Sequence, residues 1–253
     1  MSVNIPVLFA GESFREVGQF PTQLIGNGRL VGMEYRCATT SLIGFVQQIA
    51  SAYLPYGYWF YVTGTIPDWK DPSTVDAKLL AKYGIDISRS ARSRRKQAGL
   101  ANLHYLRHKH FFVLLATHGR HHFFAEEANN LCDIRKTPLI IGGYSIGYKR
   151  GNYKRKQPGQ TDPEPDDKWH SRVKIAREPF RDIKANFLNV ATRWPAERLA
   201  TELYNVPFQP YAPVRQQLRS LLRAINRHRT TAGLPTLAFD IIRWRRTIVR
   251  PFD

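Results

Sequence analysis

Two stretches of the chain indicate its fold class: Tyr58-Trp-Phe-Tyr-Val-Thr-Gly-Thr-Ile66 and His110-Phe-Phe-Val-Leu-Leu-Ala-Thr117. The first is aromatic and β-branched, as strands prefer, and Pro67 ends it because proline cannot donate to a sheet ladder. The second is apolar at nearly every position, so we expect a central strand that is covered on both faces. The two stretches predict the core of a β-sheet.

Further strands and helices alternate along the rest of the chain. A predicted hairpin at 24–31 turns at an Asn-Gly pair, and a charged loop joins predicted strands at 138–148 and 169–176. Residues 241–252 alternate loosely and predict a final strand. Apolar residues at helical spacing, with end signals, predict helices at 40–53, 73–83, 179–190, 196–204 and 213–229.

This order of elements predicts an α+β fold. We expect an antiparallel sheet with helices on one face, a ferredoxin-like or RNA-recognition-like core, and a C-terminal helical segment. Residues 1–57 supply N-terminal strands and a helix that packs on the core. Residues 58–190 form the core, with a basic helical arm at 85–107, and residues 191–253 form a basic helical C-terminal region.

The charge of the chain points to a polyanionic partner. Its 253 residues include 38 Lys and Arg against 20 Asp and Glu, a net charge of +18. Arginines outnumber lysines by 26 to 12, and the planar guanidinium grips phosphates bidentately and stacks on bases. The composition therefore favours nucleic acid over acidic membranes and acidic proteins.

Other protein classes are excluded by the composition. The longest apolar run, at 111–116, is far shorter than the roughly 20 residues of a membrane span, and residues 1–10 carry no secretion signal. The two cysteines, Cys37 and Cys132, lie too far apart for a disulfide framework and are too few for a four-cysteine zinc site. We therefore expect a cytoplasmic protein with no membrane partner.

Three groups of cations concentrate the charge: an acid-free stretch at 87–125, a turn at 149–156, and a third group at 215–250. In the third group, arginines recur every four residues and form one helical stripe whose mutual repulsion a polyanion would offset. Trp244, interleaved with arginines, adds a site for base stacking. The predicted nucleic-acid-binding residues are Arg89, Arg92, Arg94, Arg95, Lys96, Arg107, Lys149, Arg150, Lys154, Arg155, Arg215, Arg219, Arg223, Arg227, Arg243, Trp244, Arg245 and Arg246.

Six of the eight histidines fall between residues 104 and 122. Since residues two apart in a strand point the same way, His108 and His110 could hold one divalent metal, Mg²⁺ or Mn²⁺, from one face. The stretch Arg107-His-Lys-His-Phe-Phe-Val-Leu-Leu115 resembles the His-x-His strand of the HUH endonucleases, a group of rolling-circle replication initiators, relaxases and single-strand transposases. Phe60-Tyr-Val-Thr-Gly-Thr65 is similar to the leading strand of that family. Lys109 stands where the family has a bulky apolar residue.

This resemblance implies cleavage of single-stranded DNA by a tyrosine, which forms a phosphotyrosine bond beside the metal. The candidate nucleophiles are Tyr144, Tyr148 and Tyr153, which lie on a predicted strand or turn where the family usually has a helix. The alternative role for the two histidines is contact with phosphates or cover of a sheet edge.

A metal-free reaction is the second possibility, and it requires no cofactor. A histidine moves the proton, a tyrosine or serine assists, and an arginine steadies the charged phosphorane. Ferredoxin-like endoribonucleases that process CRISPR transcripts work in this manner, and a basic arm beside a sheet is similar to how they hold an RNA hairpin. His118 is the candidate histidine, with Ser145 or Tyr148 near it if their strands pair.

Together these observations predict a nucleic-acid-binding protein of a mobile or defence element, an endonuclease that acts on single-stranded or hairpin nucleic acid. The alternative is a CRISPR-type RNA-processing or RNA-binding subunit, catalytic or not, that works with other protein subunits of a ribonucleoprotein complex. The second hypothesis needs the arginines but not the histidine cluster.

Overall fold

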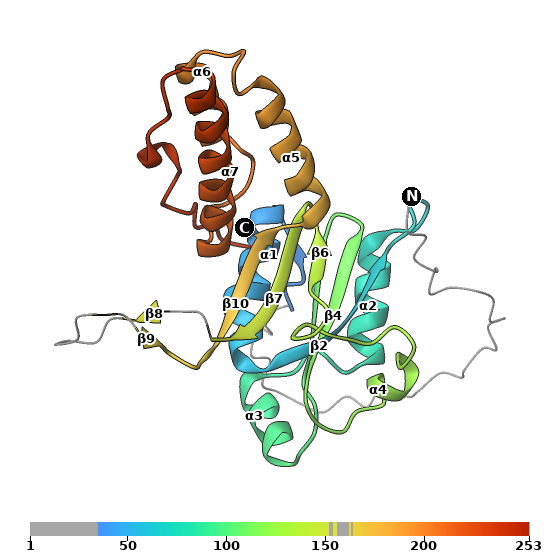
Figure 1. The fold of residues 1–253 in the computed structure, drawn as a ribbon. Helices are drawn as coiled ribbons and strands as arrows, with labels where there is room; N and C mark the ends of the chain where they lie inside the picture. Colours follow the sequence, from blue (N-terminus) through green and yellow to red (C-terminus); the bar gives the residue numbers. More distant parts are fainter. Residues whose placement is uncertain (1–34, 152–153, 156–161, 163, 253) are drawn as a thin grey trace, which may run out of the picture.

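The computed structural model describes residues 35–151, 154–155, 162 and 164–252. They form a five-stranded sheet, a three-stranded sheet, a two-stranded ribbon and a group of helices that stands beyond the sheets (Figure 1). The α+β class is confirmed. The hairpin predicted at 24–31 lies outside the described residues.

The five-stranded sheet has the order β1-β3-β4-β2-β5. β1 pairs with β3 in parallel, and the other pairs are antiparallel. β4 lies in the middle of the sheet and is buried at every position after its first residue, as its unbroken apolar sequence predicts. The strands are β1 (Ala38–Thr39), β2 (Tyr58–Thr65), β3 (Leu103–His108), β4 (Phe111–Thr117) and β5 (Cys132–Asp133).

The three-stranded sheet is antiparallel, in the order β10-β7-β6. The single strand predicted at 138–148 is a hairpin of β6 (Leu139–Ile141) and β7 (Tyr144–Arg150), and β10 (Trp169–Ile175) pairs along the whole of β7. Gly142 makes the hairpin turn at φ +51, and a Cβ there would lie 2.3 Å from Cδ2 of Leu42. The loop between β7 and β10 carries the ribbon of β8 (Lys154–Arg155) and β9 (Glu164–Pro165).

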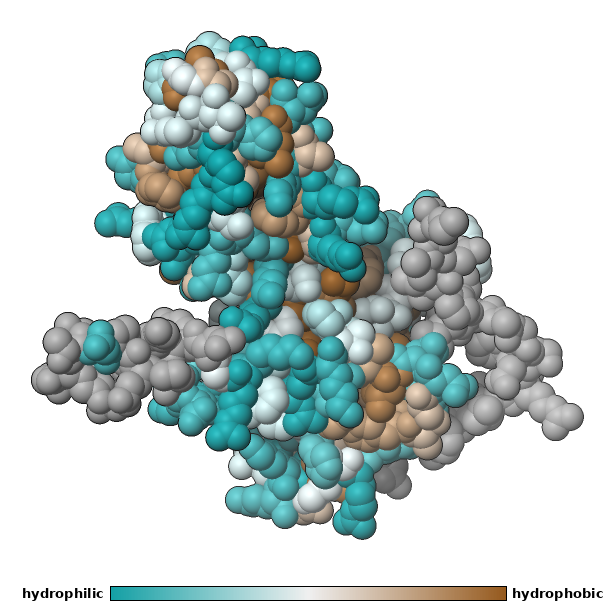
Figure 2. Space-filling model, in the orientation of Figure 1, coloured by the Kyte–Doolittle hydropathy of each residue, from teal (hydrophilic) through white to brown (hydrophobic). Residues whose placement is uncertain are grey.

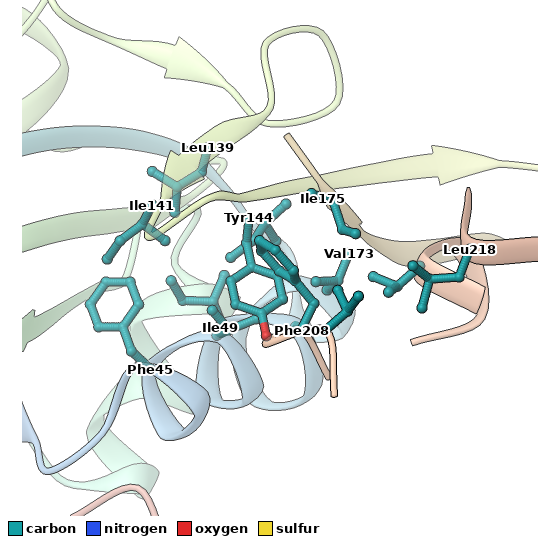
Figure 3. Close-up of a cluster of buried hydrophobic side chains, with 14 of the residues drawn as sticks. Phe45, Ile49, Leu139, Ile141, Tyr144, Val173, Ile175, Phe208 and Leu218 are labelled. Carbon is teal, nitrogen blue, oxygen red and sulfur yellow. The ribbon is translucent and has the colours of Figure 1, made fainter. Parts of the chain in front are cut away.

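Helices cover both faces of the five-stranded sheet, whereas the sequence predicts helices on one face. α1 (Leu42–Gln48) begins at Ser41, whose side chain accepts from the Gly44 amide, and continues as a π-helical turn to Tyr53. It shares one core cluster with residues of both sheets, and Figure 3 shows Phe45 and Ile49 beside Leu139 and Ile141. α2 (Pro72–Lys82) covers the opposite face, because Val75 packs with Phe112 and Leu114 in a second cluster.

α2 begins at Pro72, one residue before its predicted bound. Asp71 caps the helix, since its Oδ2 accepts from the Thr74 amide at 2.9 Å. Two short helices follow: α3 (Arg89–Gln97) and α4 (Phe123–Glu126). The basic arm predicted at 85–107 is therefore only a nine-residue helix, because residues from Leu103 onward already belong to β3.

The C-terminal helices are α5 (Arg177–Val190), α6 (Ala196–Tyr204) and α7 (Ala212–Thr231), close to their predicted bounds. α7 packs against β10 and α5 and buries the predicted face of Val214, Leu218, Leu221, Leu222 and Ile225. Within the described part of the chain, no helix is long and apolar enough to cross a membrane.

The prediction of a strand at 241–252 is wrong, because no strand is present in this segment. Beyond a short 3₁₀ turn (Phe239–Ile241), this segment is extended but pairs with no strand of the described chain. Two glutamine side chains form hydrogen bonds with the backbone of this segment. The Thr247 amide donates to Oε1 of Gln209 at 2.8 Å, and Nε2 of Gln47 donates to the Val249 carbonyl at 2.9 Å. The Pro251 carbonyl accepts from the Thr40 amide.

Candidate nucleic-acid interface

Trp244 joins two features that the sequence presents separately, the arginine stripe of α7 and the Arg-Trp-Arg segment that follows it. The guanidinium carbons of Arg215 and Arg219 lie 4.6 and 4.8 Å from the centre of the Trp244 ring, which is 57% exposed. Arg223 lies 6.0 Å from the ring of Phe239, which is also exposed. The result is a continuous surface of arginines and exposed aromatic rings along α7.

Arg227, Arg245 and Arg246 are exposed beside this surface. Arg246 lies 4.7 Å from the ring of Tyr211 at the start of α7. Hydrophilic residues cover much of the face of the α5–α7 group that Figure 2 turns to the viewer. Arg243 has a different role from the one predicted: its Nη2 donates to the carbonyls of Phe208 at 2.8 Å and Val206 at 3.2 Å, so it anchors the segment that carries Trp244.

A cavity of about 350 Å³ lies where the first turn of α7 meets β10. Three arginines from three elements line it: Arg172 of β10, Arg215 of α7 and Arg246 of the C-terminal segment. Because three cations converge on one cavity, the position suits a phosphate group.

His170 also lines this cavity and contacts a carboxylate. Its Nε2 lies 2.7 Å from Oδ2 of Asp166, and the two side chains are 32% and 12% exposed. A carboxylate on one ring nitrogen fixes the orientation of the ring. This pair is not among the residues predicted from the sequence. The available signal was the alternation in 169–175, where His170, Arg172 and Lys174 share one side of the strand and the buried Val173 and Ile175 lie on the other.

The predicted cations of α3 divide into two groups. Arg89, Arg94 and Lys96 are exposed. Arg92 is turned toward the protein, with its Nη1 donating to the Leu103 carbonyl at 2.7 Å and its Nη2 to the Ile85 carbonyl at 2.6 Å. Arg95 also points back, toward the Gly84 carbonyl at 3.5 Å. Arg92 therefore holds α3 against β3 and is not placed for a phosphate.

Arg107, another predicted nucleic-acid-binding residue, is paired with an acidic side chain of the protein itself. Its Nε lies 2.8 Å from Oδ1 of Asp76 and its Nη2 2.8 Å from Oδ2, so the pair is bidentate. The hydrogen bonds that Arg107 donates to Asp76 raise the pKa of the guanidinium above its usual value. The Tyr105 hydroxyl donates to the same carboxylate at 2.6 Å. With these partners, Arg107 belongs to the core and not to a binding surface.

The second cation group lies at the end of β7 and beyond. Lys149 and Arg150 are exposed, and they donate to the carbonyls of Arg135 and Asp167 respectively. Lys154 and Arg155 lie on β8. Tyr153 is outside the described residues.

Tyr144 and Tyr148, two of the predicted nucleophiles, are buried. The Tyr144 hydroxyl accepts from the Gln209 amide at 2.8 Å, and Figure 3 shows the ring among apolar side chains. The Tyr148 ring is stacked with Trp59 and Trp169, at 6.0 and 5.7 Å between centres. Burial raises the pKa of both tyrosines, which opposes formation of the phenolate. Neither placement suits a nucleophile that must reach a phosphate.

His108 and His110 do not share a strand, in contrast to the prediction. β3 ends at His108 and β4 begins at Phe111, so His110 lies in the hairpin turn with Lys109, whose φ is +53. Nδ1 of His108 lies 3.4 Å from the Thr39 carbonyl, and Nδ1 of His110 lies 3.1 Å from the Ile66 carbonyl. Among the described residues, no three His, Cys, Asp or Glu side chains form a group that could hold a metal. The donors present therefore do not form the site that the HUH resemblance implies.

His118 is exposed after β4, with its ring 6.4 Å from that of Phe60. Ser145 or Tyr148 would lie near His118 only if their strand paired with the strand before His118. β4 and β7 belong to different sheets, so this pairing does not occur.

A different histidine is enclosed by aromatic rings. The His104 ring stacks on Tyr53 at 4.5 Å and contacts Tyr58 at 4.7 Å, and its Nδ1 lies 2.9 Å from the Tyr35 hydroxyl. Burial, with a smaller effect of the Arg92 charge, lowers the pKa of His104 to about 3. His104 is therefore a neutral core residue near pH 7.

A scan against protein-family models and searches of curated proteins and of solved structures found no match to this chain.

Proposed function

We propose that the protein binds single-stranded or hairpin nucleic acid across α7 and the segment that follows it. The observation that carries the proposal is Trp244, an exposed ring in contact with Arg215 and Arg219. An indole face stacks on any base, and flanking guanidinium groups pair with the phosphates on either side. Arg223 and Arg227 extend the charge along the helix for the next phosphates.

The cavity of Arg172, Arg215 and Arg246 supports the same proposal. It lies at the first turn of α7, so a strand that stacks on Trp244 meets a convergent cation cluster within the same surface. Exposed Arg89, Arg94 and Lys96 of α3 give a separate cationic patch for a longer or folded substrate.

Trp244→Ala tests this proposal, with Trp69→Ala as its matched control. Trp69 is also exposed, at 78%, and also carries a cation over its ring, since Lys70 Nζ lies 4.6 Å from the centre. Fluorescence anisotropy with labelled single-stranded DNA, single-stranded RNA and a hairpin RNA measures the affinity. We expect Trp244→Ala to weaken binding by about tenfold, the effect of removing one base stack, and Trp69→Ala to leave it unchanged. Equal effects of the two substitutions would refute the assignment.

A second candidate function, metal-free cleavage of RNA, is favoured by the His170–Asp166 pair in the arginine-lined cavity. In this reaction His170 takes the proton of a ribose 2′-hydroxyl, the 2′-oxygen forms a bond to phosphorus, and the bond to the 5′-oxygen breaks. The leaving 5′-oxygen takes a proton from water, and the products are a 2′,3′-cyclic phosphate and a 5′-hydroxyl. Arg172, Arg215 and Arg246 would stabilise the negative charge on the phosphorane.

The HUH-like reaction predicts a different outcome in the same assay. It requires Mn²⁺ or Mg²⁺ and leaves a covalent protein–DNA adduct, which denaturing gels detect. Neither cleaved product nor adduct with any substrate, with or without Mn²⁺, would leave a binding subunit as the function.

A further inference from the structure

A second cavity, of about 440 Å³, lies between α2 and the five-stranded sheet. Its wall is mainly apolar, with Val75 and Leu79 from α2 and Phe112 and Leu114 from β4. The volume is within the range of small-molecule sites, about 300–1,000 Å³. It lies on the face of the sheet opposite α1, apart from the α7 surface.

Glu127 lines the same cavity although it is only 5% exposed. Its Oε1 accepts from the Tyr83 hydroxyl at 2.6 Å. Its Oε2 is buried and has no hydrogen-bond partner in the described part of the chain. A buried carboxylate oxygen without a donor costs free energy, and a ligand that brings N–H groups into the cavity would remove this cost.

Three lysines and Asp71 also line this cavity. Lys70, Lys78 and Lys82 line it, and Lys82 Nζ lies 2.9 Å from Oε2 of Glu126. Apolar walls suit a flat ring, a buried carboxylate suits N–H donors on one edge of that ring, and the lysines suit an anionic group at its other end. A nucleotide has these three properties.

We propose that this cavity binds a guanine base, whose N1–H and N2–H groups donate to Glu127 while its phosphate lies near the lysines. Guanine presents two adjacent N–H donors on its Watson–Crick edge. Adenine and cytosine present one amino group beside an acceptor nitrogen, and uracil places its N–H between two carbonyl oxygens that a carboxylate repels. The guanine belongs either to a free nucleotide or to a strand on the α7 surface, and only the second source rests on the proposed function.

Calorimetric titration with GMP, IMP and UMP tests the base preference. IMP lacks the N2 amino group and is otherwise the same ligand, so we expect GMP to bind more tightly than IMP, and IMP more tightly than UMP. Glu127→Gln retains an oxygen that accepts from Tyr83 but replaces the second acceptor with an N–H donor. We expect this variant to lose GMP affinity by about tenfold or more, since it removes a hydrogen bond to a charged group.

Two further measurements make the result specific. Thermal unfolding shows whether Glu127→Gln is folded, and we expect a melting temperature equal to or above that of the wild type because an unpaired buried charge is removed. Lys78→Glu should weaken GMP binding, whereas Lys184→Glu, the same charge change at an exposed position of α5, should not. GMP that binds no better than UMP, or equally well to Glu127→Gln, would overturn the proposal.

Oligouridylate with and without one central guanosine separates the two sources of guanine. A guanine preference of the oligonucleotide that Glu127→Gln removes supports a base from a bound strand, and Glu127-dependent binding of GMP alone supports a free nucleotide. If GMP binds in this way but no oligonucleotide binds, the cavity assignment stands and the proposed function fails. If oligonucleotides bind through Trp244 with no effect of Glu127→Gln on either ligand, the cavity assignment fails and the proposed function stands.

Discussion

Arg107 and Asp76 form a bidentate ion pair that joins β3 to α2, with side chains only 15% and 10% exposed. Arg107 was predicted from the sequence to bind nucleic acid, but its guanidinium is engaged by Asp76 inside the protein. The same carboxylate accepts from the Tyr105 hydroxyl, so removal of the guanidinium leaves a buried charge that has lost both of its guanidinium donors.

Arg107→Ala should therefore destabilise the fold and leave binding unchanged. We expect a decrease of about 3 kcal/mol in the free energy of unfolding, because the partner charge stays buried without its cation. Urea unfolding measures it, and Arg94→Ala, an exposed arginine of α3, is the control and should change stability little. A stable Arg107→Ala protein with weakened nucleic-acid affinity would contradict the structural role.

Arg219→Ala combined with Arg223→Ala should weaken nucleic-acid binding and flatten its salt dependence. For a single-stranded ligand, each arginine that no longer neutralises a phosphate reduces the slope of log K against log salt by about 0.7. Arg177→Ala with Lys184→Ala removes the same charge from exposed positions of α5 and is the control. An unchanged slope in the α7 double variant would remove the stripe from the interface.

His104 should make stability fall as the pH is lowered. Its pKa is about 3 in the folded protein against 6.5 for the free side chain, so the unfolded chain binds the proton more strongly. The contribution is fully present above pH 6.5 and decreases by about 1.4 kcal/mol per pH unit as the pH falls toward 3. Unfolding of wild type and His104→Phe at several pH values measures the difference. Parallel curves for the two proteins below pH 6.5 would show that the histidine is protonated in the folded state.

His170→Ala should abolish any RNA cleavage that occurs in the presence of a metal chelator and leave RNA binding intact. Asp166→Asn should slow the reaction less, because it loosens the orientation of the ring without removing it. His118→Ala is the control, since His118 is exposed outside the cavity. Loss of cleavage in the His118 variant with full activity in the His170 variant would reverse the assignment.

The elements with continuous or periodic apolar residues were predictable from the sequence. β4 is recognisable because each of its residues meets an apolar neighbour on one face or the other, and the buried face of α7 follows from helical spacing alone. The turn at His108-Lys109-His110 was not predictable, because it has neither glycine nor asparagine and places Lys109 at a positive φ.

The sequence predicts that arginines form the proposed binding surface, but it identifies only some of those arginines correctly. A row of arginines every four residues identifies a stripe. Sequence spacing cannot show that Arg107 is in contact with Asp76, because the two residues are 31 positions apart in the chain. Arg92 and Arg243 bind carbonyls of the chain for the same reason: their partners come from other elements. The His170–Asp166 contact also depends on how the loop before β10 folds back, which no periodicity encodes.

The glutamine contacts of the C-terminal segment determine how firmly the proposed surface is held. Gln47 and Thr40, near the first described helix, hold Val249 and Pro251, so the two ends of the described chain close on each other. Arg243 holds the same segment on the other side of Trp244, through the carbonyls of Val206 and Phe208. Trp244 therefore lies on a segment that is tethered on both sides, and its ring loses little conformational freedom when a base stacks on it.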